Sequence, residues 1–142
     1  MSQFDHLGQT ASHLFGLYEG WAKSKGLNYA SLAVLHALVK NTASTQKQIG
    51  RQWALPKQTL SATCQKLAKD GLIGFSNTET DGREKQLYLT EQGKAFATSL
   101  IYELDELEQQ ALDDFGRKRA DKFVGEMMIF VEKLEGLMQK AS

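Results

Sequence analysis

Residues 45–71, TQKQIGRQWALPKQTLSATCQKLAKDG, decide the fold of this chain. Thr45 and Gln48 have the spacing of a capping box, which predicts that a short helix begins there. Pro56 interrupts the helical pattern and suits the first turn of the next helix, which we expect over 57–70. Two short helices separated by a tight turn are typical of a helix-turn-helix.

The second of these helices has one narrow apolar stripe and an otherwise polar surface. Leu60, Cys64, Leu67 and Ala68 form the stripe, which should anchor the helix to the domain. No acidic residue precedes Asp70 in this helix, so amides, hydroxyls and ammonium groups can face bases and phosphates. The residues predicted to contact DNA are Lys57, Gln58, Thr59, Ser61, Ala62, Gln65, Lys66 and Lys69.

A hairpin is expected directly after this helix. Short strands are predicted over 72–76 and 86–89, and the polar segment between them contains the tight-turn dipeptide Asp81-Gly82. Such a wing can place the Arg83 guanidinium in the narrow minor groove of DNA, where the potential is most negative. The wing residues assigned to DNA are Asp81, Arg83 and Lys85. The pattern alone also fits a generic amphipathic helical protein with a surface hairpin.

Longer helices flank this region. Apolar residues repeat at helical spacing over 3–25 and 29–40, and two more helices are expected after Thr90, separated by Gly116. The winged region can cover only one face of the first, fifth and sixth helices, so their other stripes would leave a large apolar patch in water. Pairing two copies around a two-fold axis would bury this patch and predicts a homodimer.

Length and composition indicate one mainly α domain with a small β-wing. The 142 residues are 42% hydrophobic and 24% charged, with one cysteine, which argues against disorder and a disulfide framework. We expect a winged helix-turn-helix DNA-binding region over 28–94, flanked by dimerisation helices over 1–27 and 95–142. No apolar run could cross a bilayer and no signal peptide is visible, so a cytoplasmic protein without a membrane partner is expected.

The charges are distributed unevenly along the chain. The 17 basic and 17 acidic side chains cancel. Residues 40–94 nevertheless hold nine basic against five acidic side chains, whereas residues 95–142 hold six against ten. A basic middle segment is expected of a region that touches a polyanion.

The residues after the polar helix carry a family resemblance. They run Asp81-Gly82-Arg83-Glu84-Lys85-Gln86-Leu87-Tyr88-Leu89-Thr90-Glu91-Gln92-Gly93, after Leu72-Ile73. This run resembles the wing signature of the MarR family of transcription regulators: an Asp and an Arg two apart, a short strand, then Leu-Thr and a glycine three residues after the threonine. The resemblance extends upstream through 45–70 and covers the helix order of the whole chain.

The resemblance implies a function and roles for single residues. In that family the wing arginine, here Arg83, enters the minor groove, and the aspartate, here Asp81, holds its loop in place. The fourth helix lies in the major groove and the terminal helices build a dimer, which implies a homodimeric repressor that reads a pseudo-palindromic site on double-stranded DNA. One departure is Ala62, because the family often has a basic residue after the serine that Ser61 matches. Operator preference or affinity is therefore expected to differ.

A small-molecule site is a further hypothesis. His13, Tyr18, Trp21 and His36 combine rings with polar tips, and members of the resembled family often bind aromatic anions in the region between the dimer helices and the winged domain. A small aromatic effector that releases the operator is the partner this implies. Ordinary core packing of these rings is the alternative.

Other kinds of chemistry have little support in the sequence. Cys64 lies on an apolar stripe and is interpreted as a core residue, and Trp53 as the buried anchor of its helix. The three histidines form no cluster with cysteine or carboxylates, so no metal and no cofactor are expected. No phosphate-binding glycine loop, nucleophile elbow or H-E-x-x-H pattern is present, so an enzyme is not expected. A winged protein-interaction module without DNA binding, or a redox- or metal-responsive variant, remains the alternative.

Overall fold

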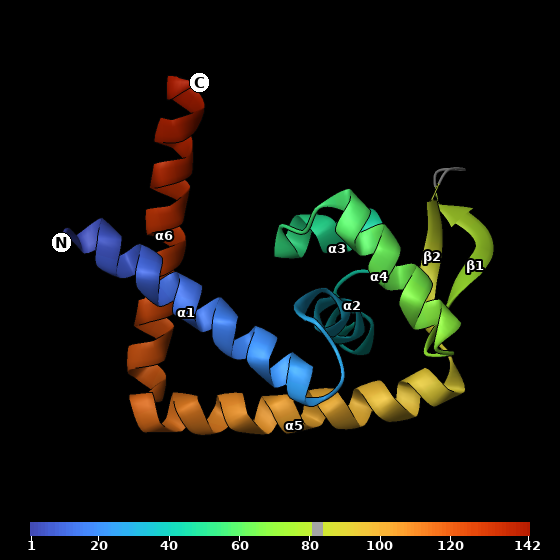
Figure 1. The fold of residues 1–142 in the computed structure, drawn as a ribbon. Helices are drawn as coiled ribbons and strands as arrows, with labels where there is room; N and C mark the ends of the chain where they lie inside the picture. Colours follow the sequence, from blue (N-terminus) through green and yellow to red (C-terminus); the bar gives the residue numbers. More distant parts are fainter. Residues whose placement is uncertain (81–83) are drawn as a thin grey trace. The chain divides into compact units, whose positions relative to one another are not determined.

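The computed structural model describes residues 1–80 and 84–142, apart from the side chains of residues 77–80 and 84. The elements are α1 (Gln3–Ser24), α2 (Tyr29–Lys40), α3 (Gln46–Trp53), α4 (Lys57–Lys69), β1 (Ile73–Thr80), β2 (Glu84–Leu89), α5 (Glu91–Phe115) and α6 (Arg117–Ala141) (Figure 1). A mainly helical chain with a small two-stranded sheet was the expected fold class, and it is confirmed. Two compact units, Met1–Ile101 and Tyr102–Ser142, divide the chain, so α5 begins in the first unit and ends in the second.

Side-chain caps explain where the first helices begin. The Asn28 side chain accepts a hydrogen bond from the Ser31 N–H at 2.8 Å at the start of α2. At α3, Thr45 Oγ1 accepts from the Gln48 N–H at 3.2 Å and Gln48 Oε1 accepts from the Thr45 N–H at 3.2 Å. These bonds satisfy amide donors that the first helical turn leaves without partners, which confirms the predicted capping box.

The turn between α3 and α4 is as short as the sequence indicates. Ala54 takes a left-handed conformation with φ of 52°, and α4 begins at Lys57 directly after Pro56. The two helices pack closely at Gly50, where a Cβ would lie 3.1 Å from Leu60 Cδ1. Gly71, with φ of 80°, then ends α4.

The core of the first unit is centred on α2, whose side chains are mostly buried. They include Ala30, Leu32, Ala33, Val34, Leu35 and Ala37. Ile49 of α3 and the α4 stripe of Leu60, Cys64 and Leu67 are at most 2% exposed. The predicted stripe of α4 is therefore confirmed for these three residues, whereas Ala68 is only half-buried, and the helix packs into the core along one face.

Trp53 corrects one expectation, because its side chain is 37% exposed rather than buried. It is the last residue of an eight-residue helix, so the core packs against α3 one turn earlier, at Ile49. The Trp53 ring meets His36 of α2 edge to face, with 5.6 Å between ring centroids. Trp53 is therefore a surface residue with one packed edge.

The two strands form an antiparallel hairpin, the wing. Ile73 pairs with Leu89 and Gly74 with Tyr88, and the pairing continues past an irregularity to Thr80 and Glu84. The strands are therefore longer than the sequence indicates, because backbone pairing continues through polar residues toward the turn. At the base of the wing the Leu87 N–H donates to the Ser44 carbonyl at 2.7 Å, which ties β2 to the segment before α3.

The second unit contains the end of α5 and all of α6. Gly116, with φ of 105°, separates the two helices. The Phe115 and Phe123 rings lie 6.0 Å apart, and the Arg119 guanidinium lies 4.2 Å from the centre of the Phe115 ring. Among the described residues, neither these helices nor the others have the length and hydrophobicity that a membrane span requires.

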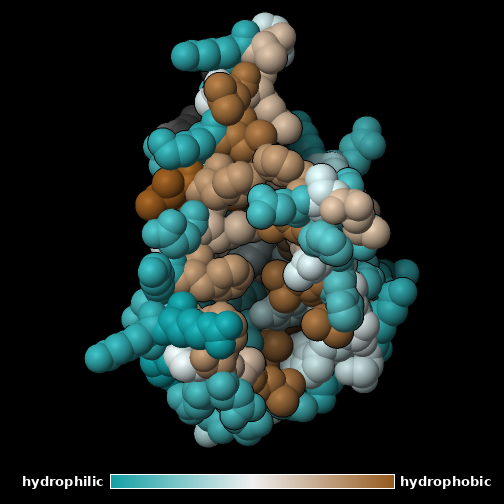
Figure 2. Space-filling model, turned by 90° about the vertical axis from the view of Figure 1, so that its left-hand side faces the viewer, coloured by the Kyte–Doolittle hydropathy of each residue, from teal (hydrophilic) through white to brown (hydrophobic). Residues whose placement is uncertain are grey.

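Large apolar side chains remain exposed on the long helices. On α6 they are Phe123, Val124, Met128, Ile129, Val131, Leu137 and Met138, and on α1 they are Phe4, Leu14, Phe15 and Leu17. Figure 2 shows hydrophobic residues, in brown, at the surface between hydrophilic ones. Neither unit buries these side chains within itself.

Candidate nucleic-acid interface

The solvent-facing side of α4 carries most of the residues that the sequence assigns to DNA. Exposed on this helix are Lys57, Gln58, Thr59, Ala62, Gln65, Lys66 and Lys69, whereas Ser61 is half-buried. Because Leu60, Cys64 and Leu67 hold the opposite face in the core, the polar side chains are displayed on a rigid support. A helix with such a face fits the major groove of B-DNA, which is about 12 Å wide.

The electrostatics of this face are basic and open to solvent. Lys66 Nζ lies 3.2 Å from Asp70 Oδ2, one turn along the helix, and both side chains are exposed. Such a surface pair contributes little stability, so Lys66 can exchange its carboxylate partner for a phosphate at little cost. Lys66 and Lys69 stand in the last turn of α4.

Of the three wing residues assigned to DNA, the structure describes one, Lys85. Asp81 and Arg83, both assigned to DNA by the sequence, lie outside the described residues. Lys85 is exposed near the start of β2. At the base of the wing the Tyr88 ring lies across Gly74 of the neighbouring strand, where any Cβ would overlap it.

Sequence reasoning assigned no DNA-related role to Thr90, which joins the wing to its neighbours. Its hydroxyl donates to the Gly71 carbonyl at 2.6 Å and accepts from the Gly93 N–H at 2.9 Å. Its own N–H donates to the Leu72 carbonyl at 3.1 Å. The Leu-Thr-x-x-Gly pattern in the sequence could have indicated this role. Its threonine and glycine are the two residues joined by the cap at the start of α5.

The four residues of the hypothetical ligand site do not share one environment. His13 is exposed, whereas Tyr18, Trp21 and His36 are half-buried. Trp21 has the Lys25 ammonium 5.4 Å from its ring centre, and His36 packs against Trp53. An aromatic contact between α1 and α2 is formed by two other residues, Phe15 and Tyr29, whose rings lie 5.9 Å apart.

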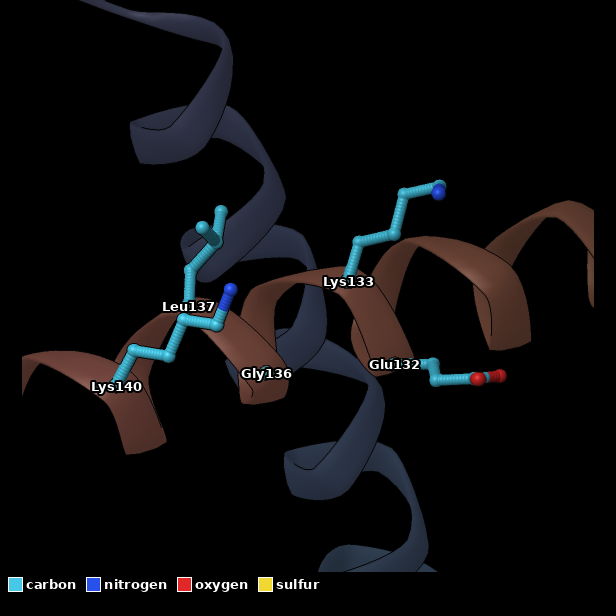
Figure 3. Close-up of a pocket in the computed structure, with 5 residues that line it drawn as sticks. All are labelled: Glu132, Lys133, Gly136, Leu137 and Lys140. Carbon is cyan, nitrogen blue, oxygen red and sulfur yellow. The ribbon is translucent and has the colours of Figure 1, made fainter.

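One groove of about 400 Å³ is described on α6. It is lined by Glu132, Lys133, Gly136, Leu137 and Lys140 (Figure 3). The groove is open and mixes two ammonium groups with a carboxylate and one apolar side chain. None of the four residues proposed for an aromatic ligand contributes to it.

Cys64 has the environment of a core residue. Its side chain is fully buried, and this burial raises the pKa of the thiol to about 11. A thiol reacts as its thiolate, so little of the reactive form exists at neutral pH. Among the described residues, no group of three histidine, cysteine or carboxylate side chains could hold a metal ion.

Comparisons with known proteins agree with this geometry. The model of the MarR family matches residues 25–84. A MarR family regulator of known structure from Neisseria meningitidis, NMB1585, is similar over 100% of both chains, with 35% identity and a TM-score of 0.89. The transcriptional regulator SarZ of Staphylococcus aureus is 29% identical over 118 residues, which are 82% of this chain and 77% of SarZ. The S. aureus MepR–DNA complex shares the fold, with 18% identity, a TM-score of 0.75, and coverage of 94% of this chain and 99% of MepR.

Proposed function

Because the chain belongs to the MarR family of regulators, which are not enzymes, we propose that it is a homodimeric repressor that binds double-stranded DNA. The observation that carries this proposal is the exposed face of α4, where amide, hydroxyl and ammonium groups stand on a helix fixed by its buried stripe. A cytoplasmic location belongs to the same proposal, because the regulator must reach the DNA that it binds.

Different side chains of α4 would contact the bases and the phosphates. Gln58 and Gln65 can form paired hydrogen bonds with an adenine edge, and Thr59 and Ser61 can bind bases or phosphates. The ammonium groups of Lys57, Lys66 and Lys69 would neutralise phosphates and so fix the position of the helix on the duplex. Ala62 leaves its position without a donor, and this favours an operator that differs from those of relatives with a basic residue there.

The wing would add contacts in the neighbouring minor groove. We assign Arg83 to the groove itself, Asp81 to holding the loop, and Lys85 to the flanking phosphate backbone. An arginine in a narrow minor groove responds to the shape and potential of the DNA, and forms few contacts that depend on base identity.

The terminal helices would form the dimer. The exposed apolar side chains of α1 and α6 need a cover that neither unit supplies by itself, and a second copy covers both sets at once through a two-fold axis. In this assignment residues 1–27 and 95–142 dimerise and residues 28–94 bind DNA. Two copies of α4 would then read a pseudo-palindromic operator with half-sites about 34 Å apart.

We also propose that a small aromatic effector controls DNA binding. His13, Tyr18, Trp21 and His36 remain its candidate residues, on helices α1 and α2. An effector releases the operator only if it binds better to a dimer whose half-site separation does not fit DNA. A tenfold loss of operator affinity requires a preference of about 1.4 kcal/mol. Thermal-shift and operator-release assays with phenolic and aromatic carboxylates test this step.

Selection of duplexes from a random pool by the purified protein tests the proposal. A DNA-binding dimer enriches one motif with two-fold symmetry, and binds it about a thousandfold or more tightly than random DNA. Random enrichment, together with binding that does not distinguish the pool from the selected duplex, would support the alternative of a protein-interaction module. The buried, protonated thiol of Cys64 speaks against a redox-responsive variant.

A further inference from the structure

The Thr90 hydroxyl forms one hydrogen bond at the end of α4 and another at the beginning of α5. A capping hydroxyl normally satisfies an amide of its own helix, and Thr90 does so for α5 through the Gly93 N–H. The same oxygen donates its proton across 19 positions of the sequence to the carbonyl of Gly71, the residue whose left-handed conformation ends α4. One side chain therefore bonds the end of α4 to the beginning of α5.

The backbone around this bond is closely packed, most tightly at Gly93. A Cβ on Gly93 would overlap the carbonyl oxygen of Leu72, and a Cβ on Gly71 would lie 3.2 Å from Gln92 Oε1. The first turns of α5 are also packed within the first unit, where Ala97, Leu100 and Ile101 are at most 4% exposed. The direction in which α5 leaves the winged region is thus set at the junction of Thr90 with Gly71 and Gly93, the Thr90 junction.

We propose that Thr90 is a positioning residue for DNA recognition, because its hydroxyl fixes the angle between α4, which would read DNA, and α5, which leads to the dimer helices. This inference rests on the proposed function, since the angle matters only where a dimer presents two copies of α4 to one duplex. Half-sites one helical turn apart require a fixed separation of the two copies. Loss of the bond to Gly71 should loosen that separation and with it the preference for one operator spacing.

Three variants separate this role from simple capping. Thr90→Val keeps the shape of the side chain and removes the hydroxyl, whereas Thr90→Ser keeps the hydroxyl. Thr90→Asp still accepts from the Gly93 N–H and so preserves the cap of α5, but its carboxylate cannot donate to the Gly71 carbonyl. Asn28→Ala is the matched control, because it removes the cap of α2 without touching the Thr90 junction.

The experiment compares dissociation constants for the selected operator and for duplexes with one base pair inserted or deleted at its centre. The wild type and Thr90→Ser should prefer the selected spacing by about tenfold or more, equivalent to about 1.4 kcal/mol. Thr90→Val and Thr90→Asp should lose most of this preference while remaining dimers by sedimentation. Asn28→Ala should melt at a lower temperature and keep the preference.

Two results would overturn the inference while leaving the proposed function intact. The first is an unchanged spacing preference in Thr90→Asp. Because this variant keeps the cap of α5, the test remains possible even if Thr90→Val does not fold. The second is an equal loss of preference in Asn28→Ala, which would make the effect one of general stability. A wild type that does not bind DNA would refute the proposed function, and the inference would fall with it.

Discussion

At the scale of single residues, a residue that reads a base and a residue that enters the minor groove can be told apart by the effect of their removal on binding. Gln65 is exposed on α4, and its removal should cost about 1–3 kcal/mol on the preferred operator and relax the choice of base at one position. Arg83→Ala should instead weaken binding to many sequences and lower the salt dependence by about one charge. Parallel titrations of operator and random duplex distinguish the two. Equal losses on both duplexes for Gln65→Ala would show that Gln65 does not read a base.

Because the thiol of Cys64 is buried, we predict that the stability of the fold depends on pH in the alkaline range. Its thiol pKa is raised from 9.0 to about 11 by burial, so the folded state holds the proton more tightly than the unfolded state. This contribution is fully present below pH 9.0 and is lost as the pH rises toward about 11. Urea unfolding should therefore show a steeper loss of stability over this range for the wild type than for Cys64→Ala. Parallel pH profiles in the two proteins, or rapid labelling of the native thiol at neutral pH, would contradict the buried assignment.

Two glycine substitutions should have opposite effects. Gly93→Ala places a Cβ against the Leu72 carbonyl oxygen and should destabilise the fold by about 1–3 kcal/mol, the usual cost of overpacking. Gly20→Ala, inside α1 with nothing within 4 Å of the new Cβ, should stabilise it by about 0.5–1 kcal/mol. Thermal denaturation of both variants checks the pair. A Gly93→Ala variant as stable as the wild type would show that α5 can shift at its first turn.

At the scale of elements, local signals in the sequence predict where helices begin and end. The caps at Asn28 and Thr45 and the left-handed Gly71 depend on residues within a few positions of each other, so spacing alone reveals them. The exposed face of α4 follows in the same way from its apolar stripe. These short-range features account for most of the fold and for most of the α4 surface.

Contacts between distant segments could not be predicted from the sequence. Bonds such as Leu87 to Ser44 and Thr90 to Gly71 depend on how elements approach one another in space. Trp53 shows the same limit, because its helical spacing matches a buried position while the end of the short helix leaves it exposed. The length of the wing strands likewise depends on backbone pairing, which side-chain patterns do not reveal.

Helix α6 provides a test of the proposed dimer. Phe123 and Leu137, two heptads apart on the same face of α6, are 59% and 66% exposed, and replacing both by lysine should place ammonium groups in an apolar interface. The double variant should be monomeric at concentrations where the wild type is a dimer, with its helical content unchanged. Glu135→Lys is the matched control on the same helix, since it adds an ammonium group at an exposed position that is already polar. Sedimentation equilibrium that gives an unchanged dimer for the double variant would exclude this face from the interface.

At the scale of the whole molecule, the proposed function requires a recognition helix held in the core, a wing and a dimer that covers the exposed apolar side chains of α1 and α6. The net charge of the chain is zero, so any affinity for DNA must come from the local arrangement of its cations. Those on α4 and β2 are Lys57, Lys66, Lys69 and Lys85, all exposed. Each one that meets a phosphate releases counterions on binding.

The most direct measurement is therefore the salt dependence of binding to the selected duplex, with the stoichiometry determined in the same titration. We predict two protein chains per duplex and an affinity that falls by about a thousandfold or more between about 50 and 200 mM salt, as expected for roughly six to ten phosphate contacts. The double logarithmic plot should be linear, and random duplex should bind more weakly at every salt concentration. One chain per duplex, or an affinity that stays constant as salt rises, would contradict the central claim.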